Sequence, residues 1–262
     1  MAAIRIENSE LELGGRILWS NLSIEVAAGE FVTVIGPNGS GKTSLLRVLL
    51  GLLRCGGTVE VLGRRPRRGS SQVGYVPQQK AIDPDLPLRG RDLVRMGIDG
   101  ARWGLALPSR SIDGEIDAIL RSVGAFAYAG AALGRLSGGE QQRLRIAQAL
   151  AGYPQLLLCD EPLLSLDLHH QREICELLGD WRRRTGSTVV FVTHDINPVL
   201  GLTDRVLAFV AGRWAVGTPD EVLTATTLTR LYGSPVEVLQ HRGRIVVLSE
   251  LGDLDEAHLH HP

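Results

Sequence analysis

The chain has 262 residues, of which 44% are hydrophobic and 22% are charged, and its formal net charge at pH 7 is −1. This length can bury a sizeable core in one large domain or two small ones, and the composition is typical of a soluble globular protein. The balanced charge gives no electrostatic reason to expect binding to nucleic acid or to an anionic membrane.

Apolar runs and cysteines indicate where such a protein works. The apolar runs fall short of the ~18 residues that a membrane-spanning helix needs, and residues 1–5 do not open a signal peptide. Three widely spaced cysteines, Cys55, Cys159 and Cys175, indicate reduced thiols in a reducing compartment. We therefore expect a cytoplasmic protein that reaches a membrane only through a partner.

The start of the chain predicts β-structure. Residues 4–7, 11–13 and 22–26 alternate apolar with polar side chains, as half-buried strands do. Residues 14–16 contain two glycines and turn the chain. Residues 31–35 are almost entirely apolar, which predicts a strand buried on both faces.

A glycine-rich loop follows this buried strand. It matches the phosphate-binding pattern G-x-x-x-x-G-K-[ST] and consists of Gly36, Pro37, Asn38, Gly39, Ser40, Gly41, Lys42, Thr43 and Ser44. The glycines let successive N–H groups face one anion, and a helix predicted over residues 44–50 adds the donors of its N-terminus. Lys42 supplies a cation for the β- and γ-phosphates, and Thr43 supplies a hydroxyl for Mg²⁺. Because strand and helix flank the loop, we predict a nucleotide site rather than a chance turn.

The middle of the chain loses its strand signals. Residues 73–78 predict a strand that ends at a proline, with Gln78 just past it. From residue 79 to residue 134 helical spacing takes over, over residues 88–96 and again over residues 111–123. We therefore predict a helical insertion within an α/β domain.

A short motif precedes the next predicted helix, over residues 141–151. Ser137 can cap that helix, while Gly138 and Gly139, ahead of Glu140, leave its N–H groups open. Taken alone, the motif is either a second anion site or only a good cap.

Two buried strands end in ionisable residues. Residues 155–162 predict an apolar strand that ends in Asp160 and Glu161, and residues 188–192 predict another that leads to His194. The carboxyl ends of central parallel strands face the ligand crevice of an α/β sheet. An acidic pair at that edge suits Mg²⁺ binding and the activation of a water molecule.

Asp167 directly precedes a helix predicted over residues 168–184. Its neighbours His169 and His170 are adjacent in sequence and so face different directions, which argues against a joint metal site. The remaining predicted elements are strands over 205–210, 214–216, 236–239 and 244–248 and a helix over 219–231.

In combination these motifs resemble the ATP-binding cassette subunit of an ABC transporter, from residue 4 to about residue 248. Residues 36–44 match the Walker A loop, residues 136–140 the family signature and residues 156–161 the Walker B strand. Gln78 stands at the place of the Q-loop glutamine and His194 at that of the switch histidine. Residues 165–167 look like the D-loop.

The resemblance implies an α/β fold: a RecA-like P-loop NTPase core with an N-terminal antiparallel β subdomain and an inserted helical subdomain. The ATPase domain would span residues 1–249. Its core would comprise residues 1–79 and 155–249, and its helical signature subdomain residues 80–154. Residues 250–262 form a polar, histidine-bearing tail.

The resemblance also implies ATP hydrolysis between two cassettes that face each other head to tail. Each ATP would lie between Walker A of one copy and Ser137, Gly138, Gly139 and Glu140 of the other. Glu161 would polarise the attacking water and Asp167 would couple the two sites. Mg²⁺ would be held by Asp160, Thr43 and Gln78, and the charge of the γ-phosphate would be stabilised by Lys42 and His194.

One position departs from the family pattern. Just before residues 14–15, where these cassettes usually carry an aromatic residue that stacks on adenine, this chain has Leu13. Either apolar contact suffices there, or another ring such as Trp19 covers the base.

The C-terminal part of the chain indicates which class of substrate is transported. Residues 217–223 and 231–238 look most like cassettes of zinc and manganese importers, and iron–siderophore cassettes are the alternative. The expected partners are a second cassette, an integral membrane permease and an extracytoplasmic substrate-binding protein, without nucleic acid. Three histidines in the tail, His258, His260 and His261, are consistent with metal binding, although a short polar tail is also typical of a disordered end.

Two other classes of function agree less well with the sequence than a transport ATPase does. A soluble cassette ATPase of DNA repair or translation would carry long coiled coils or a second cassette, and this chain has neither. A catalytically dead regulatory module would not need Glu161 and His194 together with both loops.

Overall fold

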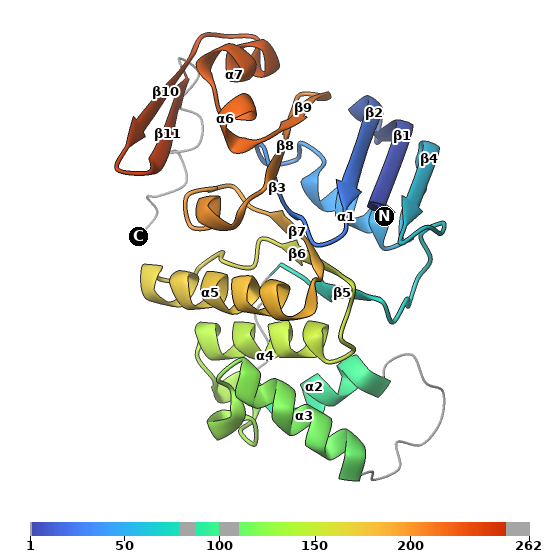
Figure 1. Cartoon of the computed structure of the whole chain (residues 1–262), viewed down its shortest axis with the longest axis vertical. Coiled ribbons are helices and arrows are strands. Elements are labelled where there is room, and N and C mark those ends of the chain that lie inside the picture. The colour runs from blue at the N-terminus through green and yellow to red at the C-terminus, as the bar shows by residue number, and fades with distance from the viewer. Residues whose placement is uncertain (1, 79–86, 100–109, 250–262) are drawn as a thin grey trace.

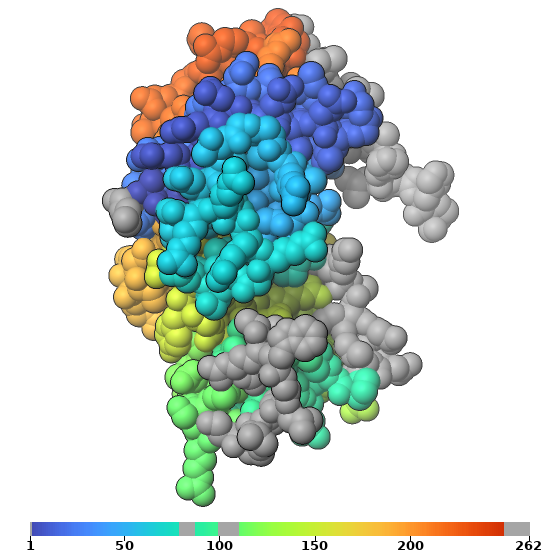
Figure 2. Space-filling model, turned by 90° about the vertical axis from the view of Figure 1, so that its right-hand side faces the viewer, coloured from blue at the N-terminus to red at the C-terminus, as the bar shows by residue number. Residues whose placement is uncertain are grey.

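The computed structural model describes residues 2–78, 87–99 and 110–249. A three-stranded sheet, a six-stranded sheet, a two-stranded hairpin and their helices are arranged along one long axis (Figure 1). The helices over residues 90–99, 110–122 and 138–150 lie at one end of this axis. The C-terminal elements, from residue 219 onward, lie at the other end. The side view in Figure 2 shows the same order, from orange through blue and cyan to yellow and green.

The N-terminal part of the chain contains a three-stranded antiparallel sheet. It has the order β2-β1-β4, from β1 (Ala2–Leu13), β2 (Arg16–Ala27) and β4 (Gly56–Val61). The two short strands predicted before residue 14 are one continuous strand. It is interrupted by register shifts around Asn8, whose φ of 47° marks an irregularity in the pairing. The N-terminal antiparallel β subdomain is therefore present.

The second sheet carries the catalytic motifs. Its six strands have the order β5-β6-β7-β3-β8-β9, parallel except for β9. In chain order they are β3 (Phe31–Ile35), β5 (Val73–Val76), β6 (Leu156–Asp160), β7 (Thr188–Val192), β8 (Arg205–Val210) and β9 (Arg213–Gly217). All residues of β6 and β7 are buried, as expected of strands covered on both faces.

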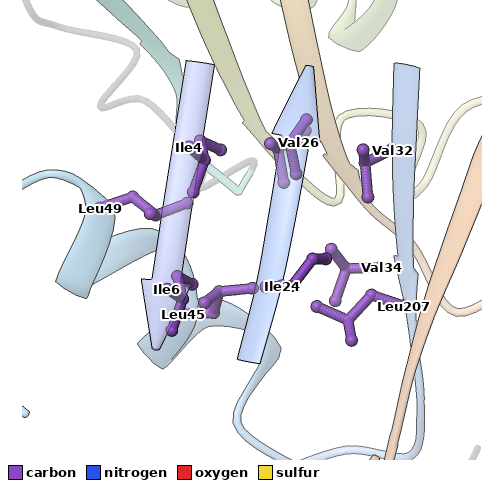
Figure 3. A pocket seen from close by; sticks show the side chains of 10 residues that line it. Ile4, Ile6, Ile24, Val26, Val32, Val34, Leu45, Leu49 and Leu207 are labelled. Carbon is purple, nitrogen blue, oxygen red and sulfur yellow. The ribbon is translucent and has the colours of Figure 1, made fainter. Parts of the chain in front are cut away.

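Helix α1 (Lys42–Leu49) follows β3 and packs between the two sheets. Figure 3 shows the apolar side chains that meet there, from β1, β2, β3, α1 and β8. Since the phosphate loop joins β3 to α1, this packing fixes both ends of the loop.

The helical segment consists of α2 (Gly90–Asp99), α3 (Arg110–Ser122) and α4 (Gly138–Leu150), with two short 3₁₀ turns before α4. The apolar side chains Ile116, Ile119 and Leu120 of α3 are buried. Helix α5 (Leu168–Thr185) follows β6 and lies next to α4 (Figure 1). The helical insertion is confirmed within the described residues.

The C-terminal part differs from the prediction in one respect. The single helix predicted over residues 219–231 is two helices, α6 (Pro219–Val222) and α7 (Ala225–Tyr232). The break occurs because Thr224 leaves helical geometry and its side chain caps α7 by accepting from the N–H of Thr227. A hairpin of β10 (Val236–His241) and β11 (Arg244–Ser249) ends the described chain.

The three cysteines are free thiols; Cys159 and Cys175 are buried, whereas Cys55 is half-buried. Within residues 2–78, 87–99 and 110–249, no helix has the length and apolar character to cross a membrane.

The core between the two sheets gives a stability prediction. Ile6 is 3% exposed and packs in this core, whereas Ile17, in the same antiparallel sheet, is 49% exposed. We expect Ile6→Ala to lower the free energy of unfolding by about 2–5 kcal/mol, the range found for such truncations in cores. Ile17→Ala is the matched control and should change it by less than about 1 kcal/mol. Urea titration measures both, and equal losses would contradict the burial difference.

Candidate active site

The phosphate loop is held by its own lysine. Lys42 Nζ donates to the carbonyl oxygens of Gly36, at 2.6 Å, and Pro37, at 3.1 Å. Gly36 has a φ of 148°, and a Cβ on it would come within 2.1 Å of the carbonyl oxygen of Phe209, so only glycine fits. Ser40 Oγ is buried in the loop with no hydrogen-bond partner among the described residues. The loop therefore combines a fixed cation with a polar group that a bound phosphate could satisfy.

Asp160 is buried at the carboxyl end of β6, directly beside the loop. Its Oδ1 accepts from Thr43 Oγ1 at 3.0 Å, and its Oδ2 accepts from the hydroxyl of Tyr75 at 3.4 Å. Burial raises the pKa of Asp160 above its usual value, while the two hydroxyl hydrogen bonds oppose that shift. A buried carboxylate next to a threonine hydroxyl is an oxygen donor set of the kind that Mg²⁺ prefers.

Tyr75 was missed by the sequence reasoning. Burial and the adjacent Asp160 raise the pKa of Tyr75 to about 12, so it stays a neutral hydrogen-bond donor. Tyr75 reaches Asp160 because β5 pairs with β6, with Tyr75 opposite Leu158. No local sequence signal reveals that pairing.

Glu161 lies between two cationic groups. Its Oε1 is 4.0 Å from Lys42 Nζ, and its Oε2 is 3.5 Å from His194 Nδ1. The interaction with His194, followed by that with Lys42, lowers the pKa of Glu161, so the carboxylate is ionised at neutral pH. Burial lowers the pKa of Lys42, and the carboxylates of Glu161 and Asp160 oppose that shift.

The backbone of Glu161 is in an unusual conformation. Its φ of 46° is in the left-handed region, which costs a non-glycine residue of order 1–3 kcal/mol. The conformation is held because the Glu161 N–H donates to the carbonyl oxygen of Val192 at 3.0 Å. In the same way, the N–H of Thr193 donates to the carbonyl oxygen of Val34 at 3.1 Å. These bonds bring the ends of β6, β7 and β3 together, and with them Glu161, His194 and the phosphate loop.

Gln78 lies just beyond β5 and is exposed. Val76 of β5 pairs with Cys159 of β6, so Gln78 is at the same sheet edge as Asp160. The structure thus brings to one edge Lys42, Thr43, Gln78, Asp160, Glu161 and His194.

The residues of the signature motif lie elsewhere in the chain's own fold, at the N-terminus of α4. Ser137 caps this helix in a capping box: its Oγ accepts from the Glu140 N–H at 3.3 Å, and Glu140 Oε2 accepts from the Ser137 N–H at 2.8 Å. The expected cap is therefore present, and it uses the N–H of Glu140 internally. Any anion would have to be bound by the remaining groups of the first turn.

Asp167 is the N-cap of α5. Both of its carboxylate oxygens accept from His170: Oδ1 from the backbone N–H at 2.9 Å and Oδ2 from the ring Nδ1 at 2.7 Å. The backbone hydrogen bond, followed by that from the ring, lowers the pKa of Asp167. His169 instead lies 3.7 Å from Glu173, so the two adjacent histidines have different partners.

The expectation that Trp19 covers the adenine is wrong. Trp19 is fully buried, packs against Phe209 and donates from Nε1 to Ser9 Oγ at 3.1 Å. Leu22, Ile24 and Val26 alternate into the core, and an irregularity at Asn21, whose φ is 50°, shifts the alternation so that Trp19 enters the core as well. Leu13 remains, with 38% of its surface exposed, as the apolar side chain that can contact a base.

The pair of Glu161 and His194 gives a pH prediction. The pKa of His194 is raised above 6.5 by Glu161, so the contribution of the pair to stability is fully present between about pH 4.5 and pH 6.5 and is lost as the pH rises through the raised value. Because the pKa of Glu161 is lowered from 4.5, the same contribution is lost again when the pH falls below that lowered value.

We therefore expect wild type to exceed His194→Gln in thermal unfolding midpoint by more at about pH 5.5 than at about pH 8.5. The glutamine keeps a polar side chain of similar reach but cannot titrate. A difference that is the same at both pH values would rule out the charged pair.

The fold and the site together define a P-loop nucleotide-binding protein. A family model described as "ABC transporter" matches residues 19–164. The chain is 35% identical over 234 residues to the zinc import ATP-binding protein ZnuC of Roseobacter denitrificans, covering 89% of this chain and 86% of that protein. It is 32% identical over 244 residues to the manganese transport system ATP-binding protein MntB of Bacillus subtilis, covering 92% and 97%.

Solved structures agree with these comparisons. The inward-facing structure of a transporter assigned to the metal-chelate type of ABC transporters has a TM-score of 0.80 at 28% identity, covering 95% of this chain and 97% of that one. CbiO1 of Clostridium perfringens, part of the ABC transporter complex cbiONQ, has a TM-score of 0.73 at 26% identity, covering 87% and 93%. This chain therefore belongs to the ABC transporter family, as an ABC-type ATPase.

Proposed function

We propose that this ATPase energises a membrane permease that imports a divalent metal ion, zinc or manganese. The observation that carries the proposal is the identity of about a third, over most of the chain, to ATP-binding proteins named for zinc import and manganese transport. The chemistry of the site is compatible with this role, because it combines a phosphate loop with an ionised carboxylate at one sheet edge.

Hydrolysis is an in-line attack of water on the γ-phosphate, which requires orientation of the water and stabilisation of the developing negative charge. Glu161 orients and polarises the water, and its low pKa keeps it ionised for that task. Lys42 and His194, on either side of Glu161, stabilise charge on the γ-phosphate. The backbone N–H groups of residues 36 and 38–44 cradle the phosphates.

The donor set at Asp160 fits Mg²⁺. Thr43 and Asp160 present oxygens 3.0 Å apart, and Gln78 stands at the same sheet edge. When bound, the ion neutralises phosphate charge, and its positive charge would offset the cost of burying the Asp160 carboxylate. Tyr75 orients that carboxylate.

Two copies would act head to tail, with the α4 N-terminus of one facing the nucleotide of the other. Ser137, Gly138, Gly139 and Glu140 would then complete the partner's site, and Asp167 would couple the two sites. Within one chain these residues are on the helical segment and at the start of α5, separate in the fold from the loop between β3 and α1 (Figure 1).

The protein would be cytoplasmic and attached to the inner face of the membrane through its permease, with an extracytoplasmic substrate-binding protein completing the importer. The division into a core of residues 1–79 and 155–249 and a helical subdomain of residues 80–154 belongs to the same proposal. The tail with His258, His260 and His261 lies outside the described residues.

Two experiments test the proposal. Affinity purification of the chain from detergent-solubilised membranes should recover a polytopic permease, whereas recovery of ribosomes or DNA would overturn the transport role. Cells that lack the chain should lose uptake of radioactive zinc or manganese, and the wild-type chain should restore it. Loss of siderophore-bound iron uptake instead would favour the alternative cargo. That alternative is retained because one structural neighbour is a transporter of the metal-chelate type.

A further inference from the structure

We infer that His170 is a positioning residue that holds Asp167 and the first turn of α4 as one unit. The inference rests on the head-to-tail dimer of the proposed function, in which both groups act on the partner's nucleotide. It starts from the Asp167 carboxylate, whose two oxygens are both hydrogen-bonded to His170. An ionised carboxylate can only accept, so the ring nitrogen Nδ1 carries the proton.

The other edge of the same ring lies against Gly139. A Cβ placed on Gly139 would come within 2.7 Å of His170 Cδ2 and 3.1 Å of Nε2, closer than side chains tolerate. Gly139 is buried in the first turn of α4, between the exposed Gly138 and the half-buried Glu140. A single imidazole thus fills the space between the α5 N-cap and the signature turn.

A second contact keeps the two helices in this register. Arg143, one turn along α4 from Gly139, forms an ion pair of 2.5 Å with Glu173, one turn along α5 from His170. The Arg143 guanidinium also donates to the carbonyl oxygen of Val123, at the end of α3, at 3.0 Å. The helical segment is therefore fastened to α5 on the side that carries Asp167 (Figure 1).

The consequence is that Asp167 and the signature turn keep a fixed spacing. In the proposed dimer both would approach one nucleotide, which is bound by the partner's phosphate loop. His170 would then affect hydrolysis in the partner's site and not in its own. A residue that only stabilises its own chain would show no such asymmetry.

The test uses two differently tagged chains that are co-purified with ATP, one of which carries Glu161→Gln so that only the other chain's site hydrolyses. When His170→Ala is placed in the Glu161→Gln chain, the active site receives its partner groups from the altered chain. We expect single-turnover hydrolysis to slow by roughly 10- to 100-fold, as for other losses of positioning. When His170→Ala is placed in the other chain, the rate should equal that of the Glu161→Gln and wild-type pair.

Two variants serve as controls. His170→Asn keeps an N–H near the position of Nδ1 and should recover most of the rate in the sensitive arrangement. Arg172→Ala, at an exposed position on the same helix, should have no effect in either arrangement.

The outcomes separate the inference from the proposed function. Equal rates in the two arrangements, whether slow or fast, would overturn the inference while the dimer stands. If Glu161→Gln chains form no ATP-dependent dimer, the head-to-tail arrangement fails first and the role in the partner's site fails with it.

The contact itself can be tested in the single chain. Gly139→Ala should lower the midpoint of thermal unfolding, because its methyl group collides with the His170 ring. In a chain that also carries His170→Ala, the same substitution should cost markedly less. An undiminished cost would show that the ring does not restrict Gly139 and would also overturn the inference.

Discussion

Glu161→Gln is expected to reduce ATP hydrolysis by about 10²–10⁴-fold, which corresponds to roughly 3–5 kcal/mol of barrier. The substitution keeps the shape and reach of the side chain but removes the charge to which the proposed function assigns the polarisation of the water. Nucleotide binding should persist, because in the proposed site residues 36–44 bind the phosphates and the substitution leaves Lys42 in place. If hydrolysis separates the proposed head-to-tail dimer, the ATP-bound dimer should then accumulate.

Turnover assays with Mg-ATP measure the first effect, and size-exclusion chromatography with and without Mg-ATP measures the second. Glu176→Gln is a suitable control, since Glu176 is an exposed glutamate on α5. Turnover near the wild-type rate would remove Glu161 from the catalytic role. Loss of hydrolysis without an ATP-stabilised dimer would leave the chemistry intact and contradict the head-to-tail arrangement.

Lys42→Ala should abolish measurable hydrolysis and weaken nucleotide binding. Lys42 is 5% exposed, and its Nζ lies within reach of the loop carbonyls and of Glu161. A hydrogen bond to a charged group contributes about 1.5–3 kcal/mol, which is roughly a 10- to 100-fold increase in Kd. Glu161 would also lose one of the two cations that lower its pKa.

Titration with a fluorescent ATP analogue at moderate salt measures the affinity. Arg54→Ala removes an exposed cation elsewhere on the surface and should leave both affinity and turnover unchanged. Because Lys42 Nζ also holds the loop through hydrogen bonds to Gly36 and Pro37, circular dichroism is needed to verify that the Lys42→Ala chain is folded. Wild-type affinity in a folded Lys42→Ala chain would contradict the assignment of the phosphate loop.

Local patterns in the sequence were sufficient for much of this protein. The strands over residues 31–35, 188–192 and 205–210 have the predicted bounds, because short, mostly apolar stretches between turn residues have few other ways to be buried. The phosphate loop could be predicted because its glycines, lysine and threonine are consecutive. The Ser137 cap could be predicted because capping depends on residues within one turn.

Contacts between distant segments were decided only by the tertiary structure. Trp19 could stack on a base as far as its residue type is concerned, but β2 packs on α1 and β8 and buries its ring. Tyr75 reaches Asp160 only because β5 pairs with β6, and His170 reaches Gly139 only because α5 packs on α4. Such pairings depend on the free energy of the whole packed core, to which residues far apart in the sequence contribute together. A local pattern carries no information about which of them become neighbours.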